Sequence, residues 1–326
     1  IIRGLNWLKN TQDSDGGWGD TDKTPEGNKP SYGKSSHKQS MTSMALLAFL
    51  GHCELQDSPQ FGPTVQKAID FLTSESPDEL TGTANNGAYA HGIRTYALCE
   101  AYTMTKIPKL KEYAKRAAIF TIKGQNENGG WAYGFGKGPV AHTDLSVSGW
   151  CIQGLKAAAL TGIPIDGLDE SMDKAIEYVK RCQDQTGRFQ YKTDSHGGQS
   201  GRGSLTGTGI LSLQIWKNAK SEEARKGLDW IVANICDNKS QKEWKNVNVY
   251  GWYYHAQACF QATGAGGANY WRAWNRDFQQ IVTKAQSEDG HWKHGYHFHG
   301  DTDIYRTAMT ILMLEVYYRY MPSTKV

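Results

Sequence analysis

Hydrophobic residues follow two alternating patterns along the 326-residue chain. Some segments carry apolar residues at helical spacing on one side only, as at Leu5 and Leu8 or at Ile176 and Val179, which is typical of a surface helix. Other segments are apolar nearly all round, which is typical of a buried helix. Six of these occur: Met41–Leu50, Thr95–Tyr102, Val147–Leu160, Gly209–Trp216, Tyr253–Phe260 and Ala308–Tyr318. The alternation predicts six inner helices inside six outer ones. An open superhelix fits the same local pattern, but its inner helices would have one face in water.

A polar segment of constant layout recurs after the one-sided helices. It runs from a Gln to an aromatic residue six positions later, in Gln12–Trp18, Gln125–Trp131, Gln183–Phe189 and Gln286–Trp292. Each copy has a glycine two positions before the aromatic residue, and glycine accepts the left-handed conformation that ends a helix. The copies are spaced by one or two units of about 55 residues, so roughly six repeats fill the chain. We therefore predict an all-α (α/α)6 toroid that forms one domain over residues 1–326, and we expect it to be part of a longer chain.

The connections between the predicted helices are unequal in length. Those that lead into an inner helix are long, whereas return connections such as 218–221 are mostly shorter. The long ones are 19–36, 77–91, 130–142, 187–204, 237–250 and 290–302. Long loops are often functional, and here they gather where all the inner helices begin. This end is the predicted mouth of a binding site, and its helix N-termini favour an anion. The alternative is that the loops only cover the ring.

Composition excludes several classes of partner. The net charge is +3 and no run of basic residues alternates with aromatic ones, so a nucleic-acid partner is not expected. The longest apolar run, Met44–Leu50, is far too short to span a membrane. The six cysteines form no Cys-x-x-Cys pair, which excludes a zinc ribbon.

The Gln-x-x-Asp-Gly-x-Trp repeats and the alternating helices resemble those of the terpenoid cyclase and protein prenyltransferase superfamily. The resemblance covers the whole chain and implies an α/α toroid with a central cavity. Four segments further resemble bacterial proteins with prenyltransferase/squalene-oxidase repeats and no established activity: His91–Tyr102, Asp144–Trp150, Tyr270–Asn275 and Leu314–Tyr320. Such proteins are often secreted or bound to the cell envelope, so we expect the same location here.

The same resemblance argues against the two best-known chemistries of the superfamily. The cyclases use an Asp-x-Asp-Asp acid, which is absent; the nearest segments, Asp144–Val147 and Asp301–Ile304, lack the paired acid. At the positions of the prenyltransferase zinc ligands this chain has Tyr250, Trp252 and Arg306, which do not bind zinc in that way. We expect neither squalene cyclisation nor prenyl transfer.

Polar and aromatic residues at the starts of the inner helices form the predicted ligand-binding site. They are His91, Arg94, His142, Asp144, Tyr250, Trp252, His255, Asp303, Tyr305 and Arg306, with Arg202 from a loop. His91, Asp144 and Asp303 are the catalytic candidates, as proton carrier and acidic partners, and arginine would bind an anion. Because a lone buried arginine is costly, Arg94 and Arg306 should face Asp144, Asp303 or an anion. Tyr89, Trp150, Trp252, Tyr253 and Tyr305 are candidates for an apolar or sugar-stacking wall. The alternative is structural: helix capping by Asp144 and Asp303, and hydrogen bonds between helices.

No cofactor is expected. The one candidate metal site is His297, His299 and Asp301, which face the same way in an extended segment. The alternative is a solvated polar loop.

These observations favour a ligand-binding toroid without an established reaction, whose ligand is a small molecule or a sugar, either of which could be anionic. Two alternatives stay open: an enzyme on an isoprenoid or other small organic substrate, and a polysaccharide (uronate) lyase or hydrolase. Other domains of the same chain are further candidate partners.

Overall fold

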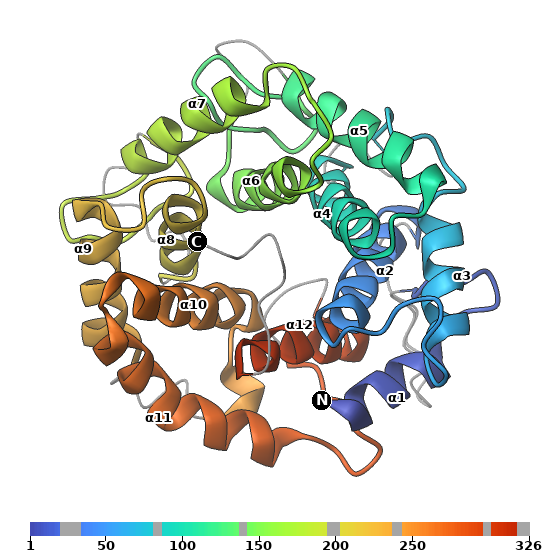
Figure 1. The fold of residues 1–326 in the computed structure, drawn as a ribbon. Helices are drawn as coiled ribbons and strands as arrows, with labels where there is room; N and C mark the ends of the chain where they lie inside the picture. Colours follow the sequence, from blue (N-terminus) through green and yellow to red (C-terminus); the bar gives the residue numbers. More distant parts are fainter. Residues whose placement is uncertain are drawn as a thin grey trace.

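The protein is described by a computed structural model that covers residues 1–19, 34–80, 87–136, 142–193, 203–236, 243–295 and 301–317. Two concentric rings of helices make up the fold (Figure 1). The outer ring consists of α1 (Ile2–Thr11), α3 (Gly62–Leu72), α5 (Pro108–Lys123), α7 (Leu168–Arg181), α9 (Glu222–Ile231) and α11 (Ala268–Ala285). The inner ring consists of α2 (Lys34–Gly51), α4 (Gly87–Thr105), α6 (Leu145–Leu160), α8 (Thr206–Ile215), α10 (Val249–Gln261) and α12 (Asp303–Leu314). Short helical turns in the described part of the chain are η1 (Val232–Cys236), η3 (Trp244–Asn246), η4 (Ala262–Ala265) and η5 (Glu315–Tyr317). This confirms the predicted (α/α)6 toroid.

The inner ring is closed. Each inner helix packs on the next, and α12 returns to pack on both α2 and α1. Every residue of α8 is buried, as the all-round apolar pattern of that segment predicts. Contact between the last repeat and the first confirms the closed ring over the open superhelix. Since closure covers the apolar faces of both end helices, it removes an exposed hydrophobic patch.

Each copy of the recurring Gln-to-aromatic segment ties the outer helix before it to the next outer helix. The side-chain amide of Gln125 donates to the carbonyl of Gly129 at 2.9 Å and to that of Ser171, on α7, at 2.8 Å. Gly129 has φ of +90°, and a Cβ at that position would lie 2.3 Å from the carbonyl oxygen of Lys174 on α7. Glycine is therefore required both for its backbone angle and for the close approach. The same arrangement holds at Gly16, Gly187 and Gly290.

The aromatic residue of the segment bonds inward. The indole N–H of Trp131 donates to the carbonyl of Thr121 on α5 at 2.7 Å, and its backbone N–H donates to Ser148 Oγ on α6 at 3.0 Å. Trp18 and Trp292 make the equivalent pairs of bonds, and Phe189 keeps the backbone bond. Each copy thus joins an outer helix to the following inner helix, which explains why the segment repeats.

Among the described residues, no helix combines the length and the apolarity needed to cross a membrane.

Candidate functional site

Side chains from four inner helices meet at the mouth of the ring, where these helices begin. We call this group the tyrosine cluster: Tyr89 on α4, Tyr133 from the loop after α5, Asp144 and Ser146 at the start of α6, Thr208 on α8, and Tyr250 on α10. The rings of Tyr89 and Tyr133 stack with centroids 6.1 Å apart. The hydroxyls of Tyr250 and Thr208 lie 3.2 Å apart, and those of Tyr133 and Ser146 3.5 Å apart.

Tyr89 and Tyr250 come from the second and fifth inner helices, so they approach each other across the ring rather than around it. Burial raises the pKa of the Tyr89 phenol, although hydrogen bonds to Ser146 and Tyr250 oppose this. Burial also raises the pKa of Tyr250, and the neighbouring phenols of Tyr89 and Tyr254 add to the effect. These phenols are therefore neutral hydrogen-bonding groups at physiological pH.

Below the cluster, buried side chains from α6 and α10 meet inside the ring. Gln153 Nε2 donates to the Tyr254 hydroxyl at 2.9 Å, and the Tyr253 hydroxyl donates to Gln153 Oε1 at 3.0 Å. Trp150 stacks on Tyr253 with centroids 5.7 Å apart. We call these four residues, the three aromatic ones and the Gln153 that joins them, the aromatic floor: Trp150, Gln153, Tyr253 and Tyr254. Trp150 and Tyr253 were predicted as wall residues and lie instead beneath the mouth.

Asp144 is the acidic member of the tyrosine cluster. Its side chain is the N-cap of α6: Oδ1 accepts from the backbone N–H of Ser146 at 2.7 Å and from the Ser146 hydroxyl at 2.5 Å. The residue is 7% exposed, and burial raises the pKa of the carboxyl, while the bonds from Ser146 lower it in part. A carboxyl with a raised pKa is suited to donate a proton, which keeps Asp144 a catalytic candidate alongside its capping role.

His91 and Arg94 face away from the mouth. The prediction that they belong to the ligand-binding site at the starts of the inner helices is therefore wrong for both. His91 Nε2 lies 3.1 Å from the carbonyl oxygen of Ala117 on α5, and burial lowers the pKa of the ring to about 4. Arg94 donates to the carbonyls of Leu72, Glu75 and Ser76 at 2.6–3.1 Å. Backbone carbonyls at the end of α3, rather than an acid or an anion, satisfy this buried guanidinium.

Trp252 and His255 also point outward, against α11. Trp252 packs edge-on to Trp274 with centroids 5.3 Å apart, and His255 packs edge-on to the same ring at 5.4 Å. His255 Nε2 lies 3.2 Å from the carbonyl oxygen of Gly203, and burial lowers the pKa of the ring to about 4. His142 is exposed in the loop before α6. Arg202 lies outside the described residues.

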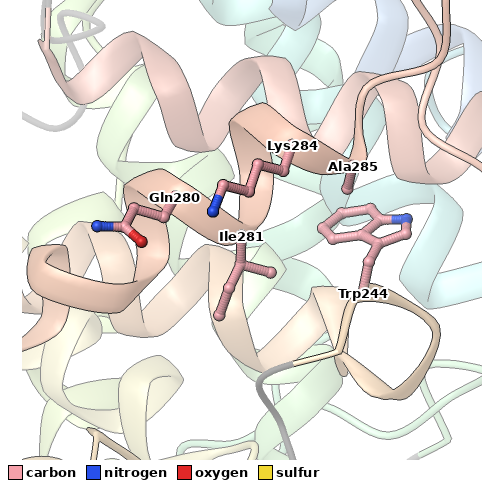
Figure 2. Close-up of a pocket in the computed structure, with 5 residues that line it drawn as sticks. All are labelled: Trp244, Gln280, Ile281, Lys284 and Ala285. Carbon is pink, nitrogen blue, oxygen red and sulfur yellow. The ribbon is translucent and has the colours of Figure 1, made fainter.

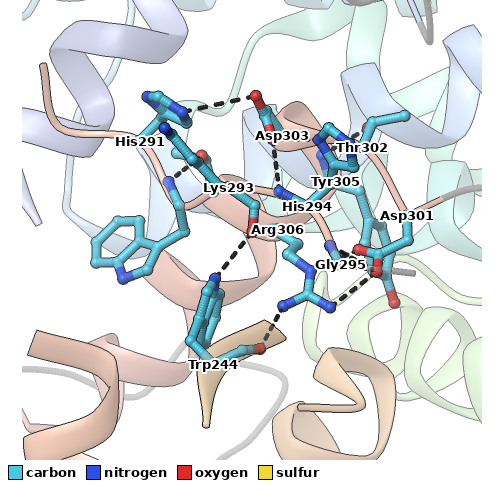
Figure 3. Close-up of polar contacts among 12 residues, drawn as sticks. Trp244, His291, Lys293, His294, Gly295, Asp301, Thr302, Asp303, Tyr305 and Arg306 are labelled. Atoms are coloured by element: carbon cyan, nitrogen blue, oxygen red, sulfur yellow. Dashed lines mark hydrogen bonds and ion pairs between the residues drawn. The ribbon is translucent and has the colours of Figure 1, made fainter. Parts of the chain in front are cut away.

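The predicted residues of the last repeat form a separate network at the start of α12 (Figure 3). The guanidinium of Arg306 donates to both carboxylate oxygens of Asp301, Nε at 2.7 Å and Nη2 at 2.8 Å, and to the carbonyls of Trp244 and Val247 at 3.0 Å. Its acidic partner is therefore Asp301, not the predicted Asp144 or Asp303. A bidentate pair of this kind is geometrically specific.

Asp303 binds two histidines of the preceding loop. Its Oδ1 lies 2.8 Å from His294 Nδ1, and its Oδ2 lies 3.6 Å from His291 Nε2. Thr302, rather than Asp303, caps α12, with its side chain accepting from the N–H of Tyr305 at 3.1 Å. The predicted capping role of Asp303 is therefore off by one residue. Tyr305 is buried on the first turn of α12.

The candidate metal site is only partly described. Asp301 uses both carboxylate oxygens on Arg306, so it is not available to a metal in this arrangement. His297 and His299 lie outside the described residues. No group of three or more His, Cys, Asp or Glu in the described part of the chain has a metal-binding geometry.

Of the predicted residues, Asp144 and Tyr250 therefore belong to the mouth, together with Tyr89 of the predicted wall. Sequence reasoning missed Tyr133, Ser146 and Thr208. Tyr133 follows Trp131 of the recurring segment by two positions, and Ser146 follows Asp144 by two. Ser146 lies within one helical turn of the predicted residue Asp144, and this proximity in the sequence could have identified it.

Comparison with known proteins agrees with the fold. The model of the squalene-hopene cyclase C-terminal domain matches residues 1–92, which places the chain with the terpenoid cyclase/prenyltransferase-like α/α toroids, as the repeats predicted. A search of the curated proteins found no match.

Several solved structures of similar fold are of proteins named as sugar-active enzymes. An α-1,6-mannanase from a Salegentibacter species is 13% identical, covers 97% of each chain and has a TM-score of 0.65. A cellobiose 2-epimerase from Bacillus thermoamylovorans is 15% identical, covers 95% of this chain and 94% of its own, and has a TM-score of 0.64. A variant of the mannanase that is inactive, with two adjacent aspartates replaced, is solved with α-1,6-mannotriose. The TM-scores, at such low identity, show a shared fold alone. The present chain contains no two adjacent aspartates.

Proposed function

We propose that this member of the terpenoid cyclase/prenyltransferase-like α/α-toroid superfamily binds a neutral saccharide at the mouth of its ring, on the tyrosine cluster. The observation that carries the proposal is the meeting of Tyr89, Tyr133 and Tyr250 with Asp144, Ser146 and Thr208 from separate repeats. Aromatic faces pack on the C–H faces of sugar rings, and a few convergent hydroxyl and carboxyl groups bind the sugar hydroxyls.

Two features support a saccharide over the other predicted ligands. The aromatic floor bridges α6 and α10 below the cluster with buried side chains, which disfavours a deep apolar chamber for an isoprenoid chain. Arg94 and Arg306 are committed to backbone carbonyls and Asp301, which disfavours an anion at the mouth. The sugar-active neighbours of similar fold favour the same ligand class, and they support the polysaccharide lyase or hydrolase alternative better than an unspecified binding module.

Titration calorimetry with α-1,6-mannotetraose and cellotetraose tests the proposal. Tyr89→Ala should weaken binding at the mouth at least tenfold, because it removes a stacking face. The matched control is Tyr102→Ala, a half-buried tyrosine near the other end of the same helix, which should leave binding unchanged. Equal affinity of wild type and Tyr89→Ala for every saccharide bound would refute binding at this cluster.

Glycoside hydrolysis is the second candidate function, and the raised pKa of Asp144 favours it. Glycosidases ordinarily use two carboxyl groups, and Asp144 is the one carboxyl group in the tyrosine cluster as the described residues define it. We therefore rank binding first. If the protein releases reducing sugar from mannan or β-glucan, Asp144→Asn should abolish that release while saccharide binding persists; release that survives Asp144→Asn would exclude this role.

A further inference from the structure

A groove of about 330 Å³ lies on the outer wall of the ring, between α11 and η3 (Figure 2). It is lined by Trp244, Gln280, Ile281, Lys284 and Ala285. None of these residues belongs to the tyrosine cluster or to the predicted site. The volume is at the small end of the ~300–1,000 Å³ range of ligand pockets, so it suits a short segment of a ligand rather than a large one.

The indole of Trp244 is held in place from behind. Its N–H donates to the carbonyl of Lys293 at 2.8 Å, and the Arg306 guanidinium lies 5.0 Å from the ring centroid. Arg306 is completely buried and is itself held by Asp301 and by the carbonyl of Trp244 (Figure 3). It also donates to the carbonyl of Val247. Because the ring is already ordered, a ligand that stacks on it does not have to immobilise it.

The lining combines a flat apolar surface with hydrogen-bonding groups. Ile281 and Ala285 extend the apolar surface of the indole, while the exposed side chains of Gln280 and Lys284 offer an amide and an ammonium group (Figure 2). Arg306 already occupies one face of the indole, and Lys284 adds a positive charge beside the groove, so a cationic ligand is disfavoured. A ring with an apolar face and polar substituents fits this lining.

We propose that the groove is a second saccharide site, in which one pyranose ring stacks on Trp244 and its substituents are hydrogen-bonded by Gln280 and Lys284. The proposal rests on the same ligand class as the proposed function but on separate residues. The mouth and the groove can therefore be tested independently.

The indole N–H signals of ¹⁵N-labelled protein report on the groove directly. The Trp244 signal is assigned by its loss in Trp244→Phe. We expect it to shift saturably with α-1,6-mannotetraose or cellotetraose. In Ala285→Arg, where the added side chain fills the groove, the shift should require at least tenfold more saccharide.

A matched control separates obstruction from added charge. Gln279→Arg places the same charge on an exposed position of α11 that does not line the groove, and it should leave the Trp244 shift unchanged. A Trp244 indole signal that does not shift with either saccharide would overturn the proposal. So would a shift of the same size at the same saccharide concentration in Ala285→Arg.

The Tyr89→Ala variant distinguishes the two sites. A Trp244 shift that persists in Tyr89→Ala supports a separate groove site, and it does so even if no binding at the mouth is detected, in which case the proposed function fails alone. A shift that disappears in Tyr89→Ala would overturn the groove proposal, because the signal would then report on binding at the mouth.

Discussion

At the scale of single residues, two histidines inside the ring are buried against backbone carbonyls rather than against a charged partner. His91 and His255 each bring one ring nitrogen to a backbone carbonyl, and their pKa values fall to about 4 because burial disfavours the imidazolium ion. Both histidines are therefore neutral parts of the helix packing, although their position at the starts of inner helices is compatible with catalysis.

These two histidines should make the protein sensitive to acid. Their folded-state pKa of about 4 lies below the unfolded value of 6.5, so the unfolded chain binds protons first as the pH falls. The two histidines contribute fully to the free energy of unfolding above pH 6.5. This contribution is lost progressively as the pH falls to about 4, by about 3 kcal/mol per histidine. Urea unfolding of wild type and His91→Gln at several pH values measures this: the variant should lose less stability between pH 6.5 and pH 4. Parallel pH profiles of the two proteins would contradict the prediction.

At the scale of elements, the recurring segment acts as a joint between neighbouring helix pairs. The side chain of Gln125 bonds to α7, and Gly129 lies close against the same helix. Trp131 bonds to α5 and α6, so one segment contacts three helices. The sequence shows the segment through its spacing and its glycine, whereas the contacts that make it a joint are seen only in the structure.

Gly129→Ala should destabilise the protein more than a left-handed backbone angle alone explains. The control is Gly162→Ala, where φ is +75° but no atom lies within 4 Å of the added Cβ. The control should cost about 1–2 kcal/mol for the backbone angle. Gly129→Ala should cost clearly more, because its Cβ would also meet the Lys174 carbonyl. Chemical denaturation of both variants measures the loss in the free energy of unfolding. Equal losses for the two variants would mean that the backbone around Gly129 shifts at little cost to accommodate the added Cβ.

At the scale of the whole molecule, closure of the ring turns six repeats into one structure. The joint at Gly290 packs against Arg3, and α12 packs on α1 and α2 (Figure 1). Closure also brings residues of distant repeats to one mouth, which no single repeat could do.

The seam between the last and first repeats should behave like an internal joint. A Cβ at Gly290 would lie 2.3 Å from the Arg3 carbonyl oxygen, the same approach as at Gly129. Gly290→Ala and Gly129→Ala should therefore lower the free energy of unfolding by similar amounts, within about 1 kcal/mol. A much smaller loss for Gly290→Ala would indicate that the ring opens at the seam in solution.

The sequence by itself determined the two-ring architecture, because the repeat period and the contrast between one-sided and all-round apolar helices are local properties. It could not determine which predicted site residues face the axis. Tyr89 and His91, like Tyr250 and Trp252, are two positions apart and so lie on nearly opposite sides of their helices. The first of each pair reaches the mouth, and the second packs on α5 or α11. A helix that is apolar all round has no hydrophobic stripe to set its rotation, so only the packing of the closed ring decided which side chains form the site.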